Sequence, residues 1–204
     1  VCVMAKVSII GTGTWGIALG MVLAQNGHEV TAWSALPKEI EALRESYTCK
    51  NLPGVEIPRS IVFTADLQEA CTDKEMLVLS VPSVFTRGVA KQMKPFVKEG
   101  QLIVSVAKGI EEKTLMTMSQ QIEEELPMAN VAVLSGPSHA EEVSRGIPTT
   151  VVAGAKDRQT AEHIQNLFMS SVFRVYTSPD ILGIELGGAL KNVIALAAGA
   201  VSYT

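Results

Sequence analysis

Short, largely apolar runs alternate along this chain with longer segments in which apolar residues recur at helical spacing. Such runs predict strands that are buried on both faces of a sheet. About eight are found, at residues 6–10, 29–33, 61–64, 76–81, 102–106, 131–134, 149–153 and 172–177. Helical patterns lie between them, among them 17–24, 37–46, 114–125 and 157–168. The alternation predicts a doubly wound, largely parallel α/β sheet of the Rossmann type.

A glycine-rich turn follows the first predicted strand and opens the first helix. Gly11, Gly13 and Gly16 stand at GxGxxG spacing. In this motif the first glycine permits a tight turn, the second lets a pyrophosphate approach, and the third lets the helix pack closely on the strand. The first N–H groups of the helix then face the phosphates. We therefore expect a bound dinucleotide; a bare structural turn is the alternative.

The end of the second strand bears on the choice of dinucleotide. NAD-preferring Rossmann domains place an Asp or Glu there to bind the ribose hydroxyls, whereas this chain has Ser34 and Ala35. Since no carboxylate would repel a 2′-phosphate, we expect NADP(H) in preference to NAD(H), which stays possible. Ser34 and Lys38 are candidates for contact with that phosphate. Ser34 could also, or instead, cap the helix that begins near Pro37.

The next two strands should end at the same edge of the sheet, where open α/β sheets bind ligands. After 76–81, Val81, Pro82 and Phe85 are placed to flank the cofactor. Core packing explains Phe85 equally well. After the strand at 102–106, Lys108 stands before a glycine. A lysine at this edge suits an anionic substrate.

A second strand-to-helix turn follows residues 131–134. There Gly136 permits close backbone approach, while Ser138 both caps a helix and offers a hydroxyl group to a ligand. The glutamates of the preceding helical region are interpreted as a solvated face without chemistry. They are Glu111, Glu112, Glu123, Glu124 and Glu125.

Composition excludes several classes of function. With 19% charged residues and a formal net charge of −4, the chain has neither a nucleic-acid footprint nor a basic membrane surface. The three cysteines lack CxxC spacing and the three histidines lack metal-ligand spacing, so we expect no metal site. Unpaired cysteines fit a reducing cytoplasm.

The helical pattern from Ile181 to Tyr203 is unlike the rest, because it is long and carries small residues on its faces. A membrane span is one interpretation, but Glu185 and Lys191 oppose it at roughly 2.5 to 3.5 kcal/mol each. We therefore expect a dinucleotide-binding domain over 1–180. Residues 181–204 should form the first helix of an all-α domain whose remainder lies outside this sequence.

Taken together, these motifs resemble the N-terminal part of bacterial NAD(P)-dependent glycerol-3-phosphate dehydrogenase. The resemblance covers essentially all 204 residues. Its motifs are GTGTWG at 11–16, NGHEV at 26–30, VPS at 81–83, AKGIE at 107–111, SGPS at 135–138 and LGGALKNV at 186–193.

On the cofactor side, the resemblance implies that Thr14, Trp15 and Ala140 contact the dinucleotide and that Lys108 contacts both cofactor and substrate. The family commonly has Arg or His at the position of Ala35, beside the adenosine ribose. This departure puts the strength and selectivity of NADP binding in question.

On the substrate side, Gly136, Ser138 and Asn192 are implied to line the site, with Lys191 as the proton acceptor. The implied reaction oxidises the C2 hydroxyl of sn-glycerol 3-phosphate to give dihydroxyacetone phosphate; its reverse supplies phospholipid backbones. The family continues into a helical domain that completes this site. A homodimer is expected for the whole enzyme.

A lysine accepts a proton only when it is partly neutral, which burial and a neighbouring cation both favour. We therefore predict that Lys108 and Lys191 lie within interaction range across a cleft. Two other functions stay open. One is a reductase of the ketopantoate or 6-phosphogluconate type, and the other is a dinucleotide-binding module without turnover.

Overall fold

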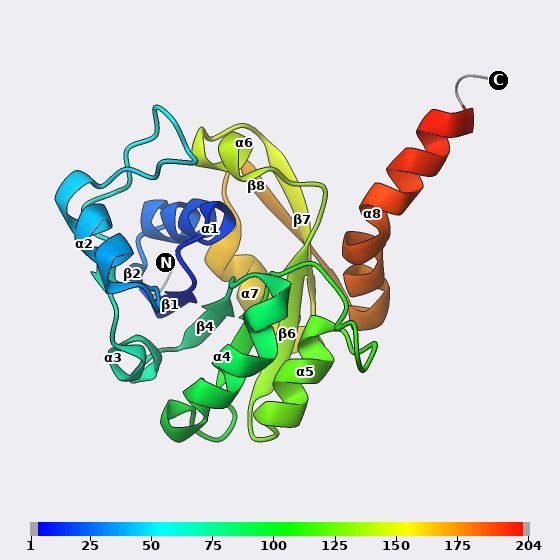
Figure 1. Cartoon of the computed structure of the whole chain (residues 1–204), viewed down its shortest axis with the longest axis horizontal. Coiled ribbons are helices and arrows are strands. Elements are labelled where there is room, and N and C mark those ends of the chain that lie inside the picture. The colour runs from blue at the N-terminus through cyan, green and yellow to red at the C-terminus, as the bar shows by residue number, and fades with distance from the viewer. Residues whose placement is uncertain (1–3, 202–204) are drawn as a thin grey trace.

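The computed structural model describes residues 4–201 and contains one eight-stranded sheet with helices on both faces (Figure 1). The strand order is β3-β2-β1-β4-β5-β6-β7-β8. All neighbouring strands run parallel except β6 and β7, which are antiparallel. The strands are β1 (Lys6–Ile10), β2 (Glu29–Trp33), β3 (Val62–Thr64), β4 (Met76–Leu79), β5 (Leu102–Ser105), β6 (Asn130–Ser135), β7 (Thr149–Gly154) and β8 (Phe173–Ser178). The predicted doubly wound, largely parallel sheet is confirmed.

Eight α-helices connect and cover these strands within the described residues. They are α1 (Thr14–Gln25), α2 (Pro37–Ser46), α3 (Leu67–Cys71), α4 (Thr86–Met93), α5 (Met118–Glu125), α6 (Ala140–Ser144), α7 (Arg158–Phe168) and α8 (Ile181–Val201). The sequence pattern did not predict α4. The pattern also placed the start of α5 at residue 114. The helix begins four residues later, at Met118, because the side chain of Thr117 caps it there.

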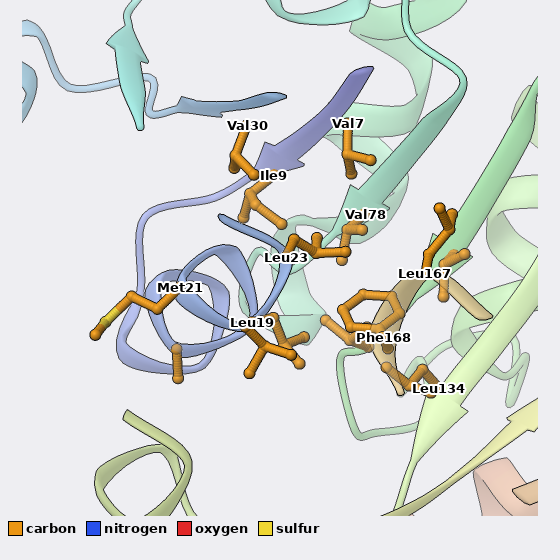
Figure 2. Packing of buried hydrophobic residues seen from close by; sticks show 14 of the residues in the cluster. Val7, Ile9, Leu19, Met21, Leu23, Val30, Val78, Leu134, Leu167 and Phe168 are labelled. Carbon is orange, nitrogen blue, oxygen red and sulfur yellow. The ribbon is translucent and has the colours of Figure 1, made fainter. Parts of the chain in front are cut away.

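Two buried clusters lie on the two faces of the sheet, because successive side chains of a strand point to opposite sides. Val78 joins the cluster under α1 and α7, whereas Leu77 and Leu79 join the cluster under α3, α4 and α5. Figure 2 shows the first cluster, where Leu23 of α1 and Phe168 of α7 lie near Val78. Both faces of the central strands are therefore buried, as their largely apolar sequences predict.

The last helix, α8, departs from this arrangement. Figure 1 shows its C-terminal half projecting away from the rest of the molecule. Its first turns pack against β6 and β7, while its exposed side chains include Val193 and Leu196. By length and composition alone, residues 181–200 could cross a membrane. However, Glu185 within this helix is buried against α5, and the helix is consistent with the start of a helical domain. Residues 202–204 of the predicted helix lie outside the described residues.

Candidate functional site

The glycine turn between β1 and α1 lies at the carboxyl edge of the sheet. Gly11 has a φ of 121°, which favours glycine, and its N–H donates to the Trp33 carbonyl at 2.8 Å. A Cβ at Gly16 would overlap the Gly11 carbonyl and the Ser80 hydroxyl. Packing within the protein therefore accounts for these two glycines.

Gly13 is different, because packing does not require it. It has a φ of −62°, which any residue can adopt, and a Cβ placed there would meet no described atom within 4 Å. A glycine in this position leaves the backbone open to something outside the chain. The close approach of a pyrophosphate provides that reason, so the turn fits a dinucleotide.

Two cavities meet at this turn and form one groove across the sheet edge. They share Gly13, Ser80, Val81 and Pro82 in their linings. The cavity over β2 and α4 has a volume of about 590 Å³, and the cavity over β5 and α6 has a volume of about 400 Å³. A groove of this form, with the glycine turn at its centre, matches a ligand that has two halves joined by phosphates.

The first cavity has apolar walls that protrude into solvent. Leu36 is 63% exposed and Phe85 is 59% exposed, and both line the cavity. The alternative interpretation of Phe85 as a core residue is therefore wrong. Exposed apolar side chains on both sides of a cavity suit an aromatic base between them.

Ser34 lies in this cavity but does not have the predicted role in the helix. Its Oγ donates to Glu39 Oε2 at 2.6 Å and accepts from the Leu36 N–H at 3.2 Å. Leu36, and not Ser34, is the N-cap of α2. The carboxylate of Glu39 also lines the cavity, together with Ala35. The expectation that no carboxylate lies at the end of β2 is therefore wrong, because Glu39 of α2 places its carboxylate against Ser34. Lys38 is exposed and lies outside the lining.

The second cavity brings together residues from four segments of the chain. Its lining includes Thr14, Trp15, Ser83, Lys108, Ser138 and Ala140. The Nε1 atom of Trp15 is buried and has no hydrogen-bond partner among the described residues. An orphaned buried donor in a cavity wall is typical of a position that a ligand satisfies. This end of the groove therefore also fits a bound dinucleotide.

Lys108 is the charged group of this second cavity. It is half-buried, and its Nζ donates to the Gly136 carbonyl at 3.0 Å. Burial, together with the charge of Lys191, holds the pKa of Lys108 below its usual value. The charge of Lys191 therefore reaches Lys108, whereas Lys191 itself is exposed and lies outside the lining of both cavities.

Helix α8 comes close to Lys108 because it carries a glycine at the crossing. A Cβ at Gly188 would lie 3.4 Å from Cγ of Lys108 and 2.9 Å from the Ser135 hydroxyl. Lys191 follows three residues later, and residues at this spacing share a helix face. Asn192 is exposed and lies outside both cavities.

Two interpretations of the turn after β6 need correction. A Cβ at Gly136 would lie 2.8 Å from the Thr150 carbonyl oxygen and 2.9 Å from Cα of Val151, so the neighbouring strand accounts for this glycine. Its carbonyl accepts from Lys108 Nζ, but Gly136 lies outside the lining of both cavities. The N-cap of α6 is His139, so Ser138 is not the predicted cap. The Ser138 hydroxyl instead donates a hydrogen bond to the Gly136 carbonyl at 3.4 Å, and Ser138 lines the cavity.

An ion-pair cluster supports the loop that follows Lys108. Arg87 of α4 donates from Nε and Nη2 to the two carboxylate oxygens of Glu111, each at 2.8 Å. It also binds Glu124 and Glu125 of α5. Arg87 lowers the pKa of Glu111 to about 2. Glu111, Glu124 and Glu125 are therefore paired and do not form a simple solvated face, whereas Glu112 is exposed and Glu123 pairs with Lys156. The sequence pattern did not predict this cluster, because Arg87 lies 24 to 38 residues from its partners.

Comparison with known proteins agrees with this geometry. The family model described as NAD-dependent glycerol-3-phosphate dehydrogenase N-terminus matches residues 6–161. A glycerol-3-phosphate dehydrogenase (NAD(P)+) of Agathobacter rectalis is 63% identical over 197 residues, which are 96% of this chain and 59% of that protein. A relative of the same name from Fusobacterium nucleatum is 55% identical over 199 residues, with 96% and 59% covered.

Solved structures place the chain in the same family. The crystal structure of glycerol-3-phosphate dehydrogenase from Coxiella burnetii superposes with a TM-score of 0.88 at 29% identity. The match covers 96% of this chain and 60% of that one. The chain therefore spans about three fifths of the length of the relatives it matches. It belongs to the NAD-dependent glycerol-3-phosphate dehydrogenase family and corresponds to the N-terminal, cofactor-binding part of its members.

Proposed function

We propose that this chain is the cofactor-binding part of an enzyme that oxidises sn-glycerol 3-phosphate to dihydroxyacetone phosphate, or catalyses the reverse reduction. The observation that carries the proposal is the position of Lys108. This half-buried lysine lies in the groove that begins at the glycine turn, and the charge of Lys191 reaches it from another part of the chain. Family membership supplies the substrate class, and the groove supplies the place for its chemistry.

Three residues of the groove then have a chemical role. Bound NAD(P)+ supplies the hydride acceptor for the C2 hydrogen of the substrate. Gly13 admits the pyrophosphate, and Trp15 offers its unpaired Nε1–H to the dinucleotide. Lys108 provides positive charge for the anionic substrate, with its Nζ oriented by the Gly136 carbonyl.

Lys191 is the proposed proton acceptor. As the C2 hydroxyl becomes a carbonyl, its proton moves to Nζ of Lys191, and in the reverse direction Lys191 returns it. Ser138 and Asn192 are proposed to bind the substrate from either side of this lysine. Lys191 is exposed in the described chain. We therefore propose that a further helical domain covers it in the whole enzyme and completes the substrate contacts.

The test separates cofactor binding from turnover. The 204-residue chain should bind dinucleotide but turn over little, because positioning of the substrate is incomplete. In a full-length enzyme carrying this N-terminal part, Lys191→Ala should abolish turnover of sn-glycerol 3-phosphate while NAD(P)H affinity stays nearly unchanged. Lys113→Ala, an exposed lysine outside the groove, is the matched control. A mild effect of Lys191→Ala would place the proton acceptor elsewhere.

The alternatives make different predictions. A ketopantoate or 6-phosphogluconate reductase would turn over those substrates and leave sn-glycerol 3-phosphate unchanged. A binding module would hold dinucleotide without turnover even when its helical domain is present. Family membership favours the dehydrogenase over both. We also propose a homodimeric whole enzyme that works in the cytoplasm, in keeping with the unpaired Cys49 and Cys71.

A further inference from the structure

We infer that Glu39 is a specificity-determining residue and that its carboxylate, held by Ser34, makes this chain prefer NAD(H) to NADP(H). This inference rests on the dinucleotide groove but needs no assumption about catalysis. It reverses the expectation drawn from the sequence, which looked for a carboxylate only directly after β2. The structure instead places a carboxylate from α2 at that position.

The first step is the geometry of the carboxylate. The Ser34 hydroxyl donates to Glu39 Oε2 at 2.6 Å and is itself fixed by the Leu36 N–H at 3.2 Å. Ser34 is buried directly beyond the end of β2. A carboxylate has about four acceptor sites, and this bond uses one of them. The other sites stay available for ribose hydroxyls, which NAD-binding Rossmann domains bind with an Asp or Glu at the end of the same strand.

The second step is the charge of the cavity. Among its described lining residues, Glu39 is the only one with a charged side chain. Arg87 of the nearby α4 is held by Glu111, Glu124 and Glu125, and Lys38 lies outside the lining. A 2′-phosphate would therefore meet a carboxylate and no lining cation. The like charge disfavours NADP(H), while the free 2′-hydroxyl of NAD(H) gains an acceptor.

The test is a pair of fluorescence titrations of the 204-residue chain with NADH and NADPH at one fixed salt concentration. The wild-type chain should bind NADH more tightly than NADPH, by about tenfold or more. Glu39→Gln keeps an acceptor for Ser34 and removes the charge. It should reduce the ratio of the Kd for NADPH to the Kd for NADH by about tenfold, mainly because NADPH binds more tightly to the variant.

Two further variants make the test specific. Glu41→Gln changes the net charge equally on the same helix, but its exposed side chain lies outside the cavity. It should leave the Kd ratio unchanged. Ser34→Ala leaves the charge but frees the carboxylate, so the ratio should fall only in part, through weaker NADH binding.

The outcomes separate this inference from the function proposed above. A wild-type chain that binds NADPH as tightly as NADH, with a ratio that Glu39→Gln does not move, overturns the inference alone. Loss of NADPH binding in Lys38→Ala would also overturn it, since that lysine would then hold the 2′-phosphate. A chain that binds neither dinucleotide would overturn both the inference and the dinucleotide groove.

Discussion

Ser119 and Glu185 join α5 to α8 through two hydrogen bonds to one buried carboxylate. The Ser119 N–H donates to Glu185 Oε1 at 2.8 Å, and the Ser119 hydroxyl donates to Oε2 at 2.6 Å. The carboxylate therefore lies at the N-terminus of α5, where the helix dipole favours negative charge. Because Lys191 follows six residues after Glu185 on the same helix, this bond pair fixes the start of the segment that carries the proposed proton acceptor.

Glu185→Ala should destabilise the chain by about 1–3 kcal/mol, because it leaves two donors of Ser119 without their acceptor. Urea unfolding measures the change. Ser119→Ala removes the hydroxyl contacts with Glu185 and Thr117 but keeps the N–H bond to Glu185, and it should cost less. Glu45→Ala, an exposed glutamate of α2, serves as the control and should change the free energy of unfolding little. Equal effects of Glu185→Ala and Glu45→Ala would mean that this carboxylate does not hold α8 in place.

Gly13→Ala should separate folding from cofactor binding. Because a Cβ at Gly13 would meet no described atom within 4 Å, the free energy of unfolding should change by at most about 1 kcal/mol. The new methyl group would stand where the pyrophosphate approaches, so NADH affinity should fall roughly tenfold. Thermal unfolding and NADH titration measure the two effects.

Gly16→Ala is the matched comparison for Gly13→Ala. Its Cβ would overlap the Gly11 carbonyl and the Ser80 hydroxyl, so it should lower the stability of the fold itself. If Gly13→Ala also unfolded the chain, or left NADH affinity intact, the distinction between the two glycines would not hold.

Local features of the site could be predicted from the sequence, and long-range features could not. The strand, turn and helix around Gly13 are contiguous, so their spacing carries the prediction. Glu39 lies only five residues from Ser34 but reaches its hydroxyl only once α2 has formed, and Arg87 reaches Glu111 only through the fold. Glu39 returns to the end of β2 because one turn of α2 brings it back, and Arg87 binds Glu111 from 24 residues away. Phe85 was ambiguous because an apolar residue looks the same in a core and in a cavity wall.

The Arg87–Glu111 pair should make stability depend on pH in acid. The pKa of Glu111 is lowered from 4.5 to about 2 in the folded chain, chiefly by Arg87. In the unfolded chain the pKa of Glu111 is about 4.3. Between about pH 2 and about pH 4.3 the unfolded state therefore binds more protons than the folded state. Its contribution to stability is therefore present above about pH 4.3 and is lost as the pH falls towards 2.

Arg87→Met should flatten this part of the pH profile. The variant keeps an unbranched apolar stem but removes the guanidinium, so the pKa of Glu111 should return towards its ordinary value. Urea unfolding of both chains between pH 5 and pH 2.5 provides the measurement. Arg158→Met removes an exposed arginine that pairs with Glu162 and is the control. A profile of Arg87→Met that runs parallel to that of the wild type would exclude the pair as a source of acid sensitivity.

Lys191→Met should raise the pKa of Lys108. Burial and the charge of Lys191 both lower the pKa of Lys108 below 10.5, burial more strongly, and the variant removes only the second cause. NMR titration of isotopically methylated lysines reports the shift at Lys108 directly. Lys113→Met, which removes an exposed lysine of the neighbouring loop, should leave that titration unchanged.

The same shift has a consequence for stability at alkaline pH. Because Lys108 has a lower pKa in the folded chain than in the unfolded chain, its charged form costs stability at neutral pH. That cost is relieved as the pH rises through the folded pKa. In Lys191→Met the pKa of Lys108 in the folded chain lies closer to its pKa in the unfolded chain. The gain in stability at alkaline pH should therefore be smaller than in the wild type. If neither the titration of Lys108 nor this gain changed, the charge of Lys191 would not reach Lys108, and the two lysines would not share a site.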